Sequence, residues 1–298
     1  MRLPRKVSIV EVGPRDGLQN EQYFLATSLK LKLIDFLKRA GFNRIEATSF
    51  VRPEWIPQLG DAEEVIKKTG RSTGVRISAL VPNYRGYVRA RDCGVEEVNI
   101  VLSASEAHNF KNVNKTVKES LRDICKIAEA ARGDEILVRG SVATSFGCPY
   151  QGTIDSKKVS EIVHELWNAG CYEVALADTI GVANPVQVYN IFSEIMESLP
   201  EVNIAAHFHD TRGMGLANVL AALQAGVAVY DSSIGGMGGC PYAPGASGNV
   251  ATEDLVHMLS EMGIETGVGM SVVKECLDWM ADVTGCKARG HVSNLGNR

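Results

Sequence analysis

The chain has 298 residues, of which 45% are hydrophobic and 22% are charged, and its formal net charge is −4. This composition is typical of a globular protein with a large core and gives no reason to expect nucleic-acid binding. No stretch approaches the roughly 20 apolar residues needed to cross a bilayer. The amino terminus runs directly into a strand-like segment, so we expect neither a membrane span nor a secretory or transit peptide.

The seven cysteines are scattered along the chain and show no CxxC spacing. An odd, scattered set in a chain of this length indicates free thiols in the reducing cytoplasm rather than a disulfide framework. We expect most of them to be small core residues. Cys240 is the exception, because it lies in a glycine-rich segment.

Short β-branched segments alternate along the chain with longer amphipathic ones, which predicts repeated strand–helix units around a parallel sheet. The predicted strands are Val7–Val12, Arg44–Thr48, Arg76–Val81, Glu97–Leu102, Ile136–Thr144, Glu173–Thr179, Asn203–His209 and Val227–Ser233. The predicted helices include Ser28–Ala40, Asn114–Arg132, Ser156–Ala169, Pro185–Ser198 and Gly213–Ala225.

Glycines and a proline support these helix ends. Gly41, Gly170 and Gly226 follow predicted helices directly, where a left-handed C-cap is favoured. Pro185 fits the first turn of its helix, where no backbone N–H is required.

Eight such units predict a closed (β/α)8 TIM barrel that forms a single catalytic domain over residues 1–298. The residues after Glu253 add further helices such as Ser271–Val283. A doubly wound open sheet uses the same units and is the structural alternative. The first strand–helix turn, EVGPRDGLQNE, has no GxGxxG phosphate motif, which disfavours that alternative.

Polar side chains gather where the predicted strands end, which is the active face of a barrel. Charged groups that converge on one rim are costly to desolvate unless they have a function there. The candidates are Arg15, Asp16, Glu46, Asp178, His207, His209, Cys240 and Asn249.

His207 and His209 are the sharpest local signal. They lie two residues apart on one strand, so both point the same way, while Ile204, Ala206 and Phe208 occupy the opposite face. The pair either presents two nitrogen ligands to one divalent ion or consists of one core and one surface histidine.

Barrel order favours the metal site, because the last strand of a closed barrel pairs with the first. His207, His209, Asn249 and Asp16 would then meet at one point. Two imidazoles, a carboxylate and an amide oxygen with open positions suit Mg²⁺ or Mn²⁺ better than a closed zinc site.

Arg15 lies beside the proposed ligand Asp16 and is either a salt-bridge partner or a fixed cation that faces a developing oxyanion. Glu46 and Asp178 are structural partners of Arg15, outer partners of the histidines, or acid–base groups. The segment Gly235–Asn249 predicts a lid that places Cys240 over the substrate as a proton donor or nucleophile; a plain turn is the alternative.

These residues lie in long motifs that resemble the 3-hydroxy-3-methylglutaryl-CoA lyases, a branch of the DRE-TIM metallolyases. The matching pieces are VEVGPRDGLQNE, EATSFV-PEWIPQ, GCPYQG, ADTIGVANP, AAHFHDT and GGCPYAPGASGNVATEDLV, which span about residues 7 to 270. The resemblance implies an acyl-CoA substrate that a retro-Claisen reaction cleaves to acetyl-CoA and acetoacetate. It also implies a homodimer and a place in leucine degradation.

For individual residues, the resemblance implies that Asp16, His207, His209 and Asn249 bind the divalent cation. Arg15 would neutralise the enolate oxygen, Cys240 would take part in proton transfer, and Glu46 and Asp178 would support the site. We expect His207 or a nearby carboxylate to be the base for the substrate hydroxyl.

The chain departs from the family pattern at Arg212-Gly213-Met214, where relatives often have Tyr-Gly-Gln. The extra cation either alters the acyl group accepted or points to solvent. The alternatives to the lyase are an enzyme for a related 3-hydroxyacyl-CoA, a Claisen condensing synthase of the same superfamily, and a catalytically inactive barrel.

Overall fold

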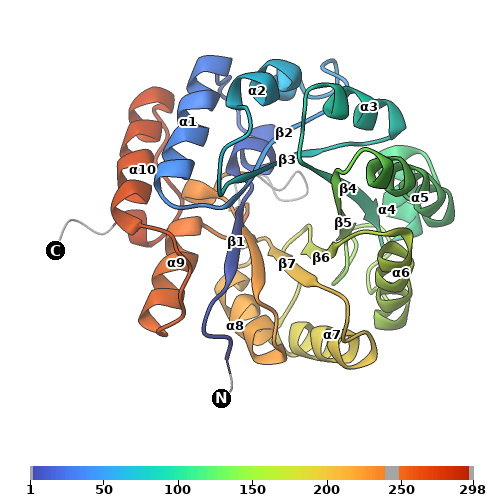
Figure 1. Cartoon of the computed structure of the whole chain (residues 1–298). Helices are drawn as coiled ribbons and strands as arrows, with labels where there is room; N and C mark the ends of the chain where they lie inside the picture. Colours follow the sequence, from blue (N-terminus) through green and yellow to red (C-terminus); the bar gives the residue numbers. More distant parts are fainter. Residues whose placement is uncertain (1–2, 239–247, 295–298) are drawn as a thin grey trace.

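The computed structural model describes residues 3–238 and 248–294. Eight parallel strands close into a barrel in sequence order, β1 to β8, and helices surround it (Figure 1). This confirms the predicted (β/α)8 fold. None of the described helices is long and apolar enough to cross a membrane.

The strands are β1 (Ser8–Glu11), β2 (Arg44–Ser49), β3 (Arg76–Leu80), β4 (Glu97–Ser103), β5 (Leu137–Ala143), β6 (Glu173–Asp178), β7 (Ile204–Phe208) and β8 (Val229–Ser232). The α-helices are α1 (Thr27–Arg39), α2 (Ala62–Thr69), α3 (Tyr84–Asp92), α4 (Glu106–Val113), α5 (Val117–Gly133), α6 (Ser156–Ala169), α7 (Pro185–Ser198), α8 (Gly215–Ala225), α9 (Thr252–Glu261) and α10 (Met270–Thr284). Short helical turns are η1 (Gly13–Gly17), η2 (Pro57–Leu59), η3 (Ile234–Gly236) and η4 (Val292–Asn294).

Two predicted helix starts were wrong. Asn114 has a φ of 55° and ends α4 instead of starting the next helix. The next helix, α5, starts only at Val117, because Thr116 and Glu119 form a reciprocal capping box. Gly213 likewise precedes its helix, since its φ of +69° is left-handed and α8 begins at Gly215.

The predicted helix ends were confirmed. Gly170 and Gly226 adopt left-handed C-caps, each with a φ of 104°. Gly41 has a φ of +95°, and a side chain there would place its Cβ 2.4 Å from the carbonyl oxygen of Gly267. Glycine is therefore required at this helix end for both conformation and space.

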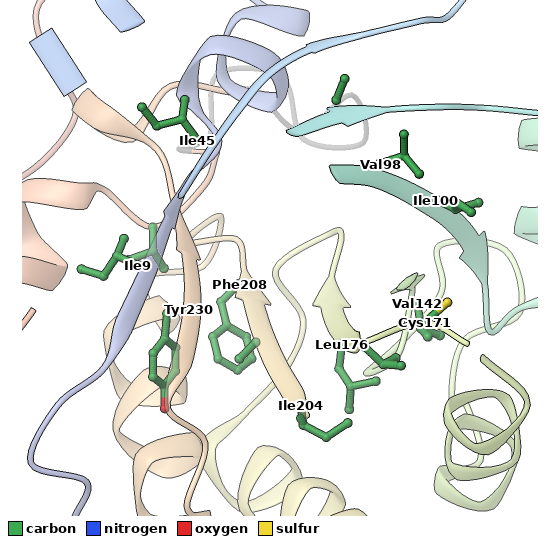
Figure 2. Close-up of a cluster of buried hydrophobic side chains, with 14 of the residues drawn as sticks. Ile9, Ile45, Val98, Ile100, Val142, Cys171, Leu176, Ile204, Phe208 and Tyr230 are labelled. Atoms are coloured by element: carbon green, nitrogen blue, oxygen red, sulfur yellow. The ribbon is translucent and has the colours of Figure 1, made fainter. Parts of the chain in front are cut away.

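The outward faces of the strands form the hydrophobic core between the barrel and its helices (Figure 2). Phe208 of β7 packs against Phe146 and against Phe192 of α7, with ring centroids 5.7 Å and 6.4 Å apart. Ile204 and Ala206 are buried on the same side of β7. The predicted outward face of this strand is therefore correct, and the two histidines point into the barrel.

The inside of the barrel is unusually polar. Many barrels fill this space with branched apolar side chains, whereas here charged and amide groups from several strands occupy it and bond to one another. The buried polar residues on the inward side include Glu46, Asn99, Arg139, Ser141, Glu173, His207 and Asp231. Such groups are stable when buried only if each is paired.

The helix α10 is additional to the eight units, because α9 already follows β8. It packs against α1, where the rings of Phe36 and Trp279 stack with centroids 5.2 Å apart (Figure 1). The prediction of extra carboxyl-terminal helices is confirmed by α10.

The described cysteines are free thiols with mixed exposure. Cys148, Cys171 and Cys276 are buried, Cys93 is half-buried, and Cys125 and Cys286 are exposed. The expectation that most are core residues is therefore correct for only half of this described set. Cys240 lies outside the described residues.

A candidate metal centre at the mouth of the barrel

A carboxylate and two imidazoles meet where β7, β8 and β1 end. The Nε2 atoms of His207 and His209 lie 3.9 Å and 4.0 Å from Oδ2 of Asp16. One ligand atom from each of the three residues lies within 4.8 Å of the others. Because metal–ligand bonds are about 2.1 Å long, one ion fits between donors at these separations.

The barrel's closure creates this meeting point. β8 pairs with β1 through Ser8–Val229, Val10–Asp231 and their neighbours, and His207 pairs with Asp231. The turn after β1 therefore lies next to the end of β7. Barrel order predicted this juxtaposition, and the structure brings Asp16, His207 and His209 together as expected.

The turn that carries Arg15 and Asp16 is held by a buried carboxylate, Glu11. Its Oε1 accepts hydrogen bonds from the backbone N–H groups of Gly13 and Ile234, at 2.7 Å and 2.9 Å. Its Oε2 accepts one from Oγ1 of Thr252, at 2.6 Å. Burial raises the pKa of Glu11 to about 7, against the opposing effect of these hydrogen bonds. Glu11 thus joins the first strand–helix turn to the segments that follow β8.

Arg15 is buried and held between two carboxylates. Its Nε and Nη2 donate to Oε2 of Glu46, at 2.9 Å and 2.6 Å, and its Nη1 donates to Asp16. Burial would lower the pKa of Arg15, but the charges of Asp16 and Glu46 raise it above its usual range. The guanidinium is therefore a permanent cation beside the imidazoles.

Glu46 is itself fixed from inside the barrel. Nδ2 of Asn99 donates to its Oε1 at 2.9 Å, and Oγ of Ser141 donates to Oδ1 of Asn99 at 2.8 Å. Both oxygens of Glu46 are thus committed to positioning contacts. Of the roles left open for Glu46, partnership with Arg15 is the one that its contacts fit.

Asp231 also belongs to the site, although it was not among the residues predicted from the sequence. Its Oδ2 lies 3.1 Å from Nδ1 of His207, which directs Nε2 of that ring toward Asp16. A metal-binding histidine commonly donates its second ring N–H to such a carboxylate, which fixes its tautomer. Burial alone would lower the pKa of His207, but the hydrogen bond and charge of Asp231 raise it.

His209 has the opposite electrostatic environment. Burial, followed by the neighbouring His207, lowers its pKa to about 4. It is therefore neutral at physiological pH, which is the form that binds metal ions. Its buried Nδ1 has no hydrogen-bond partner among the described residues.

The carboxylate between the two rings is ionised. Burial would raise the pKa of Asp16, but Arg15 and then the two histidines hold it well below its usual range. An ionised carboxylate and two imidazoles form a donor set for a divalent cation, so the residues present fit the metal that the resemblance implies.

Asn249 reaches the same cluster through its amide nitrogen. Its Nδ2 donates to Oδ2 of Asp16 at 2.8 Å and to the carbonyl oxygen of Met237 at 3.1 Å. Its backbone forms an isolated bridge with His209. In this orientation Asn249 holds a ligand in place, and binding through its Oδ1 requires the amide to turn.

Asp178 lies at the end of β6 and bonds to the loop that follows this strand, not to Asp16 or Arg15. It pairs in register with the outward-facing Phe208, and its two oxygens accept the backbone N–H groups of Val182 and Ala183, at 2.9 Å and 3.0 Å. Its contacts therefore fix the loop after β6. Burial raises its pKa despite these hydrogen bonds.

Arg212, where the sequence departs from the family pattern, contacts the same loop after β6. Its Nη1 donates to the carbonyl oxygens of Ile180 and Gly181, at 2.7 Å and 3.0 Å. Its side chain thus braces the loop after β6.

The residues that sequence reasoning missed were Glu11, Asn99, Arg139 and Asp231, which are all buried. For Asn99, Arg139 and Asp231 the available signal was strand alternation, since polar residues at inward positions of predicted strands need a partner inside the barrel. Glu11 is in register with the outward-facing Ile45, so alternation would not have marked it. Cys240 and most of its loop lie outside the described residues.

The chain matches known proteins over nearly its whole length. The model of the HMGL-like family matches residues 6–279. A rat protein named hydroxymethylglutaryl-CoA lyase, mitochondrial, is 46% identical over 291 residues, which cover 98% of this chain and 90% of the relative.

Solved structures give the same result. A Bacillus subtilis HMG-CoA lyase superposes with a TM-score of 0.96 at 45% identity, covering 98% of both chains. An Acinetobacter baumannii HMG-CoA lyase in complex with coenzyme A and 3-methylmalate has a TM-score of 0.93 at 40% identity, covering 100% of this chain and 97% of the other.

We predict that His209→Ala weakens Mn²⁺ binding, because it removes one of the three converging donors. The loss should exceed the roughly 10- to 100-fold that removing an outer partner of a metal ligand costs. Titration calorimetry with Mn²⁺ measures it. His164→Ala, on the exposed face of α6, is the control and should bind as the unmodified protein does. Equal affinities of the two variants would exclude His209 from the site.

Proposed function

Since this chain belongs to the HMGL-like family, we propose that the mouth of its barrel is the active site of a lyase that cleaves 3-hydroxy-3-methylglutaryl-CoA to acetyl-CoA and acetoacetate. The observation that carries this proposal is the convergence of Asp16, His207 and His209 beside the buried cation of Arg15. The near-complete coverage by relatives named as lyases supports it.

The reaction is a retro-Claisen cleavage in which the bond between C2 and C3 of the substrate breaks. A bound Mg²⁺ or Mn²⁺ would polarise the C3 hydroxyl and favour loss of its proton. Asp16, His207 and His209 would hold this ion, with Asn249 as the fourth protein ligand. The bond electrons pass to the thioester, which becomes the enolate of acetyl-CoA.

We propose that the hydroxyl proton passes to a carboxylate next to His207. Nδ1 of His207 faces Asp231 at 3.1 Å and its Nε2 would bind the ion, so the ring has no lone pair left to take this proton. In water the enolate has a high free energy. The fixed positive charge of Arg15 lowers the free energy of the enolate in the site. Three of the five N–H donors of Arg15 bond to Glu46 and Asp16. Within the described residues no hydrogen bond to a protein group takes up the remaining two donors, which would be available to a substrate oxygen.

Glu46 and Asp178 support the reaction by positioning. Glu46 keeps the guanidinium of Arg15 in place, and Asp178 fixes the loop after β6. Neither residue needs to exchange a proton in this mechanism. Cys240 is proposed as the acid that protonates the enolate carbon, because in the sequence its glycine-rich segment comes directly after β8 and η3.

The domain organisation, oligomeric state, cellular location and pathway are inferred from the family resemblance. We propose that residues 1–298 act as one catalytic domain in a cytoplasmic homodimer, and that the activity serves leucine degradation. A condensing synthase and a lyase for another 3-hydroxyacyl-CoA are the alternatives. The names of the relatives support the 3-hydroxy-3-methylglutaryl-CoA lyase over both.

The substrate is tested with a panel of 3-hydroxyacyl-CoA thioesters in Mg²⁺ or Mn²⁺. We expect acetoacetate and acetyl-CoA to form from the 3-hydroxy-3-methylglutaryl compound, and activity to disappear on chelation and to return with either ion. Condensation of acyl-CoA with a ketoacid in place of cleavage would identify a synthase and refute the proposal.

We predict that Cys240→Ala lowers kcat by roughly 10²- to 10⁴-fold, because a positioned proton donor contributes a factor of this size. The Mn²⁺ content of the protein should be unchanged. Stopped-flow or steady-state assays, with metal analysis of the same samples, test this. Cys286→Ala removes an exposed thiol and is the matched control, with kcat unchanged. An undiminished kcat in the Cys240 variant would rule out its role.

A further inference from the structure

Arg139 lies inside the barrel in the first half of β5 and is among the largest fully buried side chains, with 1% of its surface exposed. Its Nη1 and Nη2 donate to the two oxygens of Asp231, at 3.0 Å and 2.7 Å. Its Nε donates to Oε1 of Glu173 at 2.7 Å. The guanidinium is thus fixed by two carboxylates on different strands.

The carboxylate of Asp231 in turn contacts His207, a candidate metal ligand. Oδ2 of Asp231, one of the two atoms that Arg139 binds, also lies 3.1 Å from Nδ1 of His207. Two hydrogen bonds from a planar guanidinium determine both the position and the plane of the Asp231 carboxylate. That plane in turn sets the direction of the Nδ1–H bond of His207.

Arg139 keeps its positive charge inside the barrel. Burial would lower the pKa of Arg139, but Asp231 and Glu173 raise it well above its usual range. Asp231 is itself buried and faces this cation with both of its oxygens. The two side chains therefore form a buried, doubly hydrogen-bonded ion pair.

We propose that Arg139 is a positioning residue for the metal centre: through Asp231 it holds His207 in the tautomer that carries its proton on Nδ1 and turns Nε2 to the ion. The inference rests on the proposed metal centre and adds to it a residue that touches neither the ion nor the substrate. A neutral imidazole has one N–H group, so fixing that proton on Nδ1 leaves the lone pair of Nε2 free to bind.

A purely structural role is the competing explanation, because a buried arginine between two carboxylates also stabilises the barrel. A substitution of Arg44 provides the control that distinguishes the two explanations. Its Nη1 and Nη2 donate to Glu173 at 2.9 Å and 2.8 Å, so it belongs to the same charge cluster. Within the described part of the chain no hydrogen bond joins Arg44 to Asp231.

The test compares Arg139→Lys with Arg44→Lys. Both variants keep a positive charge and lose the planar fork, but only the first removes hydrogen bonds to Asp231. Mn²⁺ affinity is measured by electron paramagnetic resonance in the absence of substrate, and thermal unfolding is recorded on the same samples. We expect R139K to bind Mn²⁺ roughly tenfold more weakly, at the lower end of the effect of losing an outer partner, and R44K to bind as the unmodified protein does.

Equal Mn²⁺ affinities of R139K and R44K, with both folded, would overturn the proposal in favour of the structural role. The absence of substrate separates this result from the proposed reaction. If R139K loses affinity but the unmodified protein cleaves no thioester, the positioning role stands and the proposed reaction fails.

A second measurement needs no variant. In the unmodified protein loaded with Mg²⁺, ¹⁵N-histidine NMR should show His207 with a proton on Nδ1 that is protected from exchange. A His207 ring that carries its proton on Nε2 would overturn the proposal. This spectrum tests the tautomer on which the proposal depends even if R139K does not fold.

Discussion

The pairing of β8 with β1 is the contact on which the site depends. It places the turn after the first strand beside the end of the seventh, so residues separated by most of the chain become neighbours. Asp16 then lies within 4.0 Å of both imidazoles. An open sheet of the same strands would leave these groups on opposite edges. Closure of the barrel is therefore a condition for the chemistry as well as for the core.

Closure also creates an interior that excludes water, and the protein fills it with paired charges. A buried ion pair commonly costs about as much in lost hydration as it gains in attraction. The arrangement of Arg15, Glu46, Arg139 and Asp231 therefore contributes geometry more than stability. Each carboxylate holds a cation or an imidazole in one orientation, and the groups that face the mouth are set before any substrate arrives.

The sequence predicted the fold well because its signals were local and repeated. Eight alternating segments, the glycines after helices and the inward pair His207 and His209 each follow from strand or helix periodicity. The helix starts at Val117 and Gly215 were missed because they depend on a capping box and on one left-handed glycine. Such details change a boundary without changing the hydrophobic pattern.

The site was predicted in part, and the missing part has a physical cause. Asp16, His207 and His209 could be brought together by barrel order alone. The partners Asp231 and Arg139 lie on β8 and β5, and their contact is across the interior, where side-chain length and rotamer decide the pairing. The position of Asp178 at a strand end suggested a partner of Arg15, an outer partner of the histidines or an acid–base group, whereas its oxygens bind the loop backbone.

The central claim is that one cation is held by the ends of the first and seventh strands. A crystal soaked in Mn²⁺, with data collected at the manganese absorption edge, tests it most directly. We predict one strong anomalous peak at bonding distance, about 2.1 to 2.2 Å, from a carboxylate oxygen of Asp16 and from Nε2 of both His207 and His209. A peak bound elsewhere, or none at this position at saturating Mn²⁺, would contradict the account.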